Sequence, residues 1–112
     1  MADHSVNVIV DKDVTLDATT TGTGCLVERY AELLAILDVT AVAGTNPTLD
    51  VAIQVSADDA VYITVQSFSQ ITSTGTVYKA LTNFGKWVRL VYTIGGTDSP
   101  SFTVNSTITL KT

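Results

Sequence analysis

The sequence predicts an all-β protein, folded as a single-domain antiparallel β-sandwich of the jelly-roll type. Val, Ile and Thr supply 15, 7 and 19 of the 112 residues, and these β-branched residues fit a pleated strand better than a helix. Apolar and polar residues alternate through several stretches that are separated by Gly, Pro, Asn and Asp, which is typical of strands joined by turns. A chain of this length is large enough for one hydrophobic core and too short for two.

The first predicted strand is short and lies near the N-terminus. Val6, Val8 and Val10 occupy every second position, which predicts a half-buried or edge strand. We therefore divide the chain into an N-terminal arm or edge strand over residues 1–12 and a β-sandwich domain over residues 13–112.

The next two strands are predicted on either side of a tight turn. The stretch from Leu33 to Val42 is nearly all apolar, and Leu49 to Val55 alternates cleanly. Gly44 to Pro47 lies between them and holds residues that favour chain reversal, so we expect a β-hairpin. A turn or two of helix within Arg29 to Leu37 is an alternative, because apolar residues there also follow a helical spacing. A strand is favoured because no cap or Gly ends such a helix.

The second half of the chain predicts a further turn, two shorter strands and a long final pair. Asp58 and Asp59 mark the turn, and "AVYITVQSF" and "TGTVYKAL" follow it. A second Gly-Thr and Pro turn, Gly95 to Pro100, predicts another hairpin. The alternation gives each arm of this hairpin one apolar, inward face. The inward residues are Val88, Leu90, Tyr92 and Ile94 on the first arm and Phe102, Val104, Ile108 and Leu110 on the second. Ser106 is the one polar residue in this inward set.

Charge and composition exclude several classes of function. The net charge is −5 and only six Lys and Arg are spread along the chain, so no basic stripe is available for nucleic acid or an anionic membrane. No apolar run approaches the roughly 20 residues that span a bilayer. The N-terminus lacks the regions of a secretory signal, and the single Cys forms no disulfide within the chain.

The residues that resemble catalytic or metal-binding groups have simpler explanations. His4 is isolated from other ligand types, and Asp11, Asp13 and Asp17 are interrupted by Lys12 and lack the Gly of a calcium loop. We expect no metal site and no cofactor, and we interpret the aspartates as a solvated turn.

Catalytic motifs are also missing from the sequence. Asp58 and Asp59 are interpreted as turn residues rather than as a carboxylate pair of a hydrolase. Cys25 is flanked by Gly24 and Leu26 and is interpreted as a small packed residue. The nucleophile and phosphate-binding motifs are absent, so the chain is not expected to be an enzyme.

Aromatic residues provide the strongest candidates for binding a partner. If Val88 and its neighbours face the core, Trp87 and Arg89 face outward, and both types are enriched where protein partners dock. The alternative is that Trp87 is covered at the start of a strand. Tyr62 and Tyr78 are either packing residues or, together with Trp87, a platform on which sugar rings stack.

Several short motifs follow one another in a characteristic order: LDVT, GTNPTLDV, the turn in QVSADD, SFSQIT, and WVR ahead of GGTDSPSF. This order resembles a group of small virion proteins of tailed bacteriophages and prophages. The resemblance covers roughly Leu34 to Ile108 and leaves the first thirty residues outside. Trp87 stands where the group usually has Tyr, and Ala60-Val61-Tyr62 stands where Thr-Thr-Trp is common. The resemblance implies a β-sandwich and a structural role in the head or tail.

Two hypotheses follow from this resemblance. In the first, the chain is a capsid decoration (cement) protein that binds the major capsid protein and sister subunits, forms a homotrimer, and is incorporated into virions assembled in the host bacterial cytoplasm. Its contacts are then expected at Val6, Val8 and Val10, as an added strand, and at Trp87 and Arg89. In the second, it is a tail or fibre-associated β-sandwich that binds a receptor or glycan.

Overall fold

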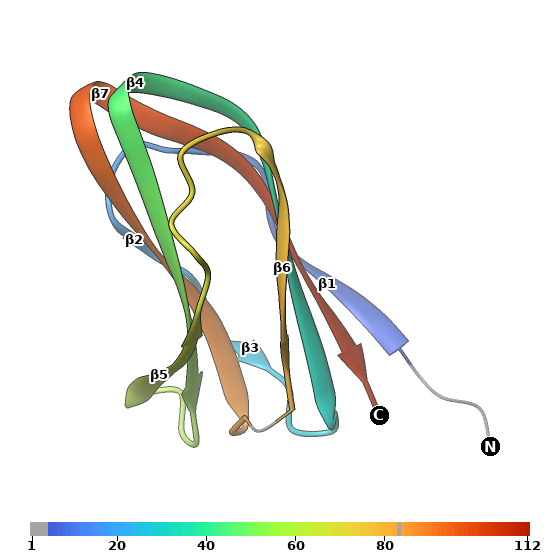
Figure 1. The fold of residues 1–112 in the computed structure, drawn as a ribbon. Coiled ribbons are helices and arrows are strands. Elements are labelled where there is room, and N and C mark those ends of the chain that lie inside the picture. Colours follow the sequence, from blue (N-terminus) through green and yellow to red (C-terminus); the bar gives the residue numbers. More distant parts are fainter. Residues whose placement is uncertain (1–4, 83) are drawn as a thin grey trace.

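The structure is a computed structural model that describes residues 5–82 and 84–112, with the side chains of residues 5–7 and 9 outside the description. The all-β, antiparallel prediction is confirmed, and none of the described residues is helical, so the helical alternative within Arg29 to Leu37 is wrong. Figure 1 shows the seven strands: β1 Ser5–Leu16, β2 Thr20–Thr21, β3 Cys25–Leu26, β4 Glu32–Ser56, β5 Tyr62–Ser67, β6 Gly75–Leu81 and β7 Trp87–Lys111.

The two long strands, β4 and β7, organise the fold. They pair with each other along their whole length, from Glu32 opposite Lys111 to Ser56 opposite Trp87. Each bends sharply near its middle, and in Figure 1 the sheet folds over at these two bends. The predicted hairpins are therefore wrong in their pairing, because the two arms of each long strand face each other across the core. Gly, Asn and Pro reverse the chain in either arrangement, and local turn chemistry does not determine which strand becomes the hydrogen-bonded neighbour.

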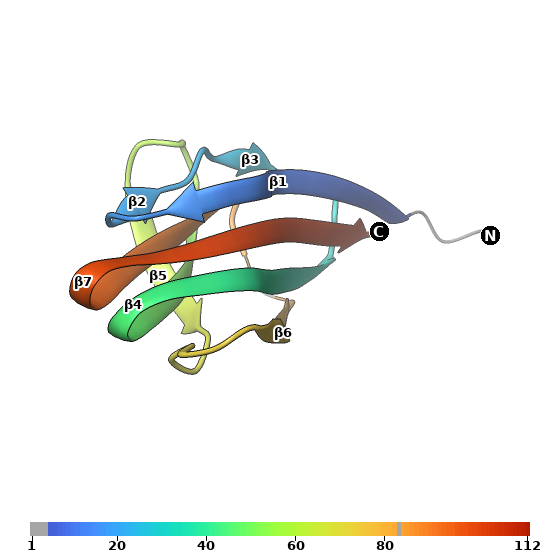
Figure 2. The same ribbon diagram turned by 90° about the horizontal axis from the view of Figure 1, so that it is seen from above.

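The folded sheet forms two layers, which Figure 2 shows from above. The first layer contains β1, the arm of β7 at 101–111, the arm of β4 at 32–43, and β6. The second layer contains β2 and β3, the arm of β7 at 87–95, the arm of β4 at 48–56, and β5. In chain order the strand segments are β1, β2 together with β3, the two arms of β4, β5, β6 and the two arms of β7. The first segment pairs with the eighth, the second with the seventh, the third with the sixth and the fourth with the fifth. This order is compatible with the predicted jelly roll.

The core lies between the layers and follows the predicted alternation. Ser106 is fully buried, as its place in the inward set predicts, and Ile94 is half-buried near the bend. The other inward residues of the long strands are buried: Leu33, Ala35, Leu37, Val39, Leu49, Val51, Ile53, Val55, Val88, Leu90, Tyr92, Phe102, Val104, Ile108 and Leu110. Burial of this many large apolar side chains is the main stabilising contribution to such a fold.

A buried polar cluster connects the two layers. The hydroxyl of Tyr92 donates a hydrogen bond to Oδ2 of Asp11 at 2.7 Å and lies 2.6 Å from Oγ of Ser106. Because the single hydroxyl hydrogen of Tyr92 is used toward Asp11, Ser106 is the donor in the second bond. Every buried polar group needs such a partner, since an unpaired one is costly.

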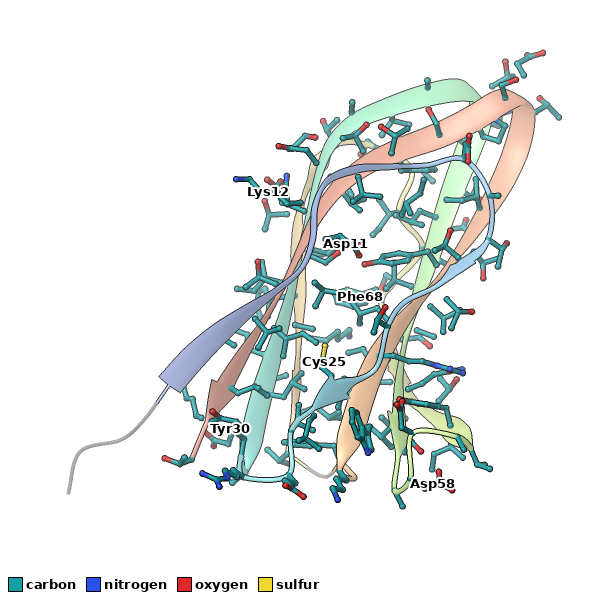
Figure 3. The ribbon with its side chains drawn as sticks, turned by 180° about the vertical axis from the view of Figure 1, so that it is seen from behind. Asp11, Lys12, Cys25, Tyr30, Asp58 and Phe68 are labelled. Carbon is teal, nitrogen blue, oxygen red and sulfur yellow. The ribbon has the colours of Figure 1, made fainter. Side chains whose placement is uncertain are left out.

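β1 is an edge strand that runs through the expected boundary at residue 12. It pairs with β7 from Ser5 to Leu16, and its register shifts on both sides of Asp11. These bulges direct Asp11 toward the interior and leave Lys12 on the outside, as Figure 3 shows. The backbone N–H of Asp13, in the left-handed region, donates to Oδ1 of Asn105 at 2.9 Å.

Candidate functional site

Trp87 and Arg89 lie on the outer face of the second layer, as the alternation predicts. Their neighbours Val88 and Leu90 are buried, and both outward side chains are half-buried. Trp87 pairs with Leu26 on one side, and Leu26 is 49% exposed. An aromatic and an aliphatic side chain therefore lie side by side on this face.

Arg89 is held by two neighbours on adjacent strands. Its Nε donates to Oε1 of Gln54 at 2.8 Å, and its guanidinium lies over the ring of Tyr62, 3.8 Å from the ring centre. A cation over an aromatic face is attracted to the ring. These contacts fix the direction of a side chain that is flexible in most surface positions.

Tyr62 is itself fixed by a hydrogen bond from its hydroxyl to the carboxylate of Asp59. Loss of water around the hydroxyl, together with this bond to Asp59, raises the pKa of Tyr62 to about 12. A side chain at Gly24 would collide with the Tyr62 hydroxyl and the Asp59 carboxylate, so the absence of a Cβ at Gly24 allows this arrangement. We call Leu26, Gln54, Tyr62, Trp87 and Arg89 the Trp87 patch.

The three-aromatic sugar platform is contradicted by the positions of its members. Tyr78 pairs with Ile36 in the first layer and is 69% exposed there, whereas Tyr62 and Trp87 lie on the outer face of the second layer. The strands carrying Tyr78 and Trp87 belong to opposite layers, and sequence alternation within single strands does not determine which layer each strand joins.

The partner contact at Val6, Val8 and Val10 stays a prediction, and the structure places two of these residues against the core. Val8 lies opposite the buried Ile108, so it shares the inward face of the first layer. Val8 and Val10 are half-buried against the core of the chain itself. The backbone of Val6 pairs with Leu110, and its side chain is outside the described part. Val8 and Val10 therefore pack within the fold, because the register of β1 on β7 places Val8 on the inward face.

A second exposed surface, which sequence reasoning missed, lies on β5 and on Val61 directly before it. Val61 and Ile63 are 71% and 61% exposed and Val65 is 38% exposed. Together with Val55 and Phe84 they line an open depression of about 470 Å³. We call these five residues the β5 groove. The available signal was the stretch from Ala60 to Tyr78, which contains no charged residue.

The interpretation of Asp11 as part of a solvated turn is wrong, because Asp11 lies in β1 and accepts a hydrogen bond from Tyr92. Asp58, in contrast, forms hydrogen bonds within a turn. The carboxylate of Asp58 accepts hydrogen bonds from the N–H groups of Ala60 and Val61 at 3.0 and 3.1 Å and from Oγ of Ser56 at 3.0 Å. These bonds stabilise the charged form and lower the pKa of Asp58. The interpretation of Asp58 and Asp59 as turn residues is confirmed.

Neither a metal ligand set nor a reactive thiol is found in the described part of the chain. No group of three or more His, Cys, Asp or Glu side chains is placed there to hold an ion, and His4 lies outside it. Cys25 is half-buried beside the core, and Figure 3 shows it within the fold. Burial, and then the charge of Asp11, raise the pKa of its thiol, which lowers the thiolate fraction that reacts.

The comparisons with known proteins identify no relative. No protein family, curated protein or solved structure matches the chain. Within the described residues, no helix is long and apolar enough to cross a membrane.

Proposed function

We propose that this chain is a virion structural protein of a tailed bacteriophage, and more specifically a decoration protein that binds the major capsid protein on the head surface. The motif order over Leu34 to Ile108 supports this role, and the fold is compatible with the β-sandwich that the resemblance implies. The protein then acts by adhesion, stabilising the head through contacts between subunits.

The observation that carries the proposal is the Trp87 patch. Trp and Arg dominate the binding energy of many protein interfaces, especially where they are held in place before the partner arrives. Gln54 and Tyr62 hold Arg89 in this way, so little side-chain entropy remains to be lost on docking. Trp87 and Leu26 add apolar surface beside it.

The same geometry favours a protein partner over the glycan of the tail or fibre hypothesis. A sugar ring stacks on an open aromatic face, but one face of Tyr62 is already covered by Arg89. Tyr78, the most exposed aromatic residue, lies on the other layer. A polar and aromatic surface with a fixed Arg fits a carboxylate-bearing protein surface better.

The test is decoration of expanded heads that were assembled without the protein. Purified protein should co-sediment with these heads and appear as regular extra density in electron micrographs. Trp87→Ala or Arg89→Ala should weaken binding by ten-fold or more, as expected for a residue worth about 2 kcal/mol. Tyr78→Ala is the matched control, because it removes an exposed aromatic side chain from the opposite layer.

Two outcomes would contradict the proposal. Wild-type protein that stays in the supernatant with heads but binds isolated tails, or a glycan, would transfer the role to the tail. A loss of head binding in Tyr78→Ala equal to that in Trp87→Ala would remove the patch as the contact. Circular dichroism of each variant establishes that it remains folded.

A further inference from the structure

Arg89 has no counter-ion within the second layer. It is the only Lys or Arg on the strand segments of that layer, and Asp50 is the only acidic residue on them. Asp50 lies four positions along β4 from Gln54, the residue opposite Arg89, so about 13 Å of strand separates it from Arg89. Among the described residues, the one ion pair joins Lys86 to Glu28. Arg89 is therefore paired with no carboxylate in the described part of the chain.

Most of the hydrogen-bonding capacity of Arg89 is also unused. A guanidinium has N–H groups on all three of its nitrogens, and only the Nε–H has a partner, the side-chain oxygen of Gln54. No buried side-chain nitrogen in the described residues lacks a partner, so the two terminal nitrogens of Arg89 remain accessible. Tyr62 covers one face of the guanidinium. A planar group held in this way, with its terminal nitrogens open, has the geometry of a bidentate carboxylate site.

We propose that Arg89 binds the carboxylate of an Asp or Glu side chain of the partner protein through both terminal nitrogens. The inference rests on the proposed function, which makes the Trp87 patch the docking surface. Docking removes water from a side chain that is already half-buried, and a covered charge without a counter-ion is strongly unfavourable. The partner must therefore supply the negative charge. Tyr62 and Gln54 hold the guanidinium beforehand, which reduces the entropy lost on binding.

A single carboxylate fits this surface better than a phosphate group or a nucleic acid. Sites that recognise phosphorylated segments usually combine several basic side chains, whereas Arg89 has only uncharged neighbours in the patch: Leu26, Gln54, Tyr62 and Trp87. The chain carries a net charge of −5, which repels a polyanion. One carboxylate on an otherwise uncharged partner surface adds a single negative charge, next to the one positive charge on this face.

Trp87 determines what lies beside the carboxylate on the partner. Trp87 and Arg89 are two positions apart on β7 with the buried Val88 between them, so they share the outer face about 7 Å apart. The exposed Leu26 lies beside Trp87. The partner segment is therefore expected to carry an acidic and an apolar side chain at this spacing, as residues two positions apart on an extended strand do.

The first test measures the binding of short capped peptides that differ in one residue, which is Glu in one peptide and Gln in the other. Each peptide carries one Leu two residues before or after this position, and Thr elsewhere. Trp87 is the only Trp of the chain, so a saturable change in its fluorescence reports occupancy of the patch. The Glu peptide should bind about ten-fold more tightly than the Gln peptide, because hydrogen bonds to a charged group are stronger than neutral ones.

The second test changes the availability of Arg89 and keeps the rest of the patch. Gln54→Glu keeps an acceptor beside Nε and places a carboxylate there, so the affinity for the Glu peptide should fall to that for the Gln peptide. Arg89→Lys keeps the positive charge but has no planar fork, and it should lose the same preference. Gln66→Glu is the matched control, because it adds the same charge on β5 outside the patch, and it should keep the preference. Circular dichroism establishes that each variant is folded.

Three results would overturn the carboxylate pairing. They are equal affinity for the two peptides, no saturable response to either peptide, and an unchanged preference for the Glu peptide in Arg89→Lys or Gln54→Glu. None of these measurements uses heads, so they are separate from the test of the proposed function. Wild-type protein that decorates heads without preferring the Glu peptide contradicts the pairing alone. A preference for the Glu peptide without head binding contradicts the decoration role alone.

Discussion

The hydroxyl of Tyr92 joins the two layers at the centre of the core. Its ring comes from the second layer and its partner Ser106 from the first, while Asp11 reaches in from the bulge of β1. Ser106, the polar residue in an otherwise apolar inward set, thereby has a hydrogen-bond partner. The same contacts tie the edge strand β1 to both arms of β7.

Tyr92→Phe should lower the free energy of unfolding by about 1–3 kcal/mol, because it leaves the buried hydroxyl of Ser106 without an acceptor and Asp11 without its donor. The double variant Tyr92→Phe/Ser106→Ala removes both buried hydroxyls and should recover part of this loss. Urea unfolding followed by fluorescence of the single Trp measures both values. Additive losses in the double variant would show that the cluster is not a coupled unit.

Stability should also fall at alkaline pH through Tyr92. Burial, followed by the effect of the Asp11 carboxylate, raises the pKa of Tyr92 above its ordinary value of 10.0, although the Ser106 hydrogen bond acts in the opposite direction. The folded state therefore keeps a proton that the unfolded chain has lost. The stabilisation of the folded state by this proton is complete below pH 10 and is lost as the pH rises toward the folded pKa of Tyr92. The free energy of unfolding then falls with a limiting slope of about 1.4 kcal/mol per pH unit.

The comparison of wild type with Tyr92→Phe isolates this effect. The raised pKa values of Cys25 and Tyr62 act in the same direction in both proteins and cancel in the difference. The stability advantage of the wild type should shrink above pH 10. An advantage that stays constant up to pH 11.5 would contradict the role of the Tyr92 proton.

The bends of β4 and β7 depend on their glycines. Gly96 has φ +116°, and a Cβ there would lie 2.9 Å from the backbone oxygen of Asn46 and from Cα of Pro47. Gly44 has φ +104°, and a Cβ there would lie 2.7 Å from Cα of Pro100. The two bends are therefore in direct contact, and each requires the other chain to approach without an intervening side chain.

Gly96→Ala should destabilise the protein more than Gly75→Ala, by at least about 1 kcal/mol. Both positions have positive φ, so both variants carry backbone strain of about 1–3 kcal/mol. A Cβ at Gly75 meets nothing within 4 Å, whereas one at Gly96 meets backbone atoms. Thermal and urea unfolding of the two variants measure the difference. Equal losses of stability in Gly96→Ala and Gly75→Ala would mean that the two bends can move apart without further cost.

β5 differs from the other strands in what its apolar side meets. The inward residues of β4 and β7 are buried, but Ile63 of β5, which pairs with the buried Val55, is 61% exposed. An alternating strand is predicted from its sequence in both cases. The missing cover becomes evident only from the arrangement of strands around it.

The molecule as a whole is elongated, with principal extents of 51 × 29 × 20 Å, and it offers distinct surfaces in distinct directions. The Trp87 patch lies on the outer face of the second layer and the β5 groove at its edge. Tyr78 is exposed on the first layer.

The sequence by itself determined the strand class, the inward faces of the strands and the outward direction of Trp87 and Arg89. These follow from the two-residue period of a strand, which is a local property of the backbone. It also determined Ser106 as the polar exception and Asp58 as a turn residue, because turn preferences act over a few neighbouring positions.

The tertiary structure alone decided which strands became neighbours. It turned the expected hairpins into bends, directed Val8 and Val10 toward the core, separated Tyr78 from Trp87, and brought Tyr62 and Gln54 to Arg89. Strand pairing joins residues up to 106 positions apart, as for Ser5 and Lys111. Such pairing depends on the burial of the whole sheet at once, and no local pattern encodes it.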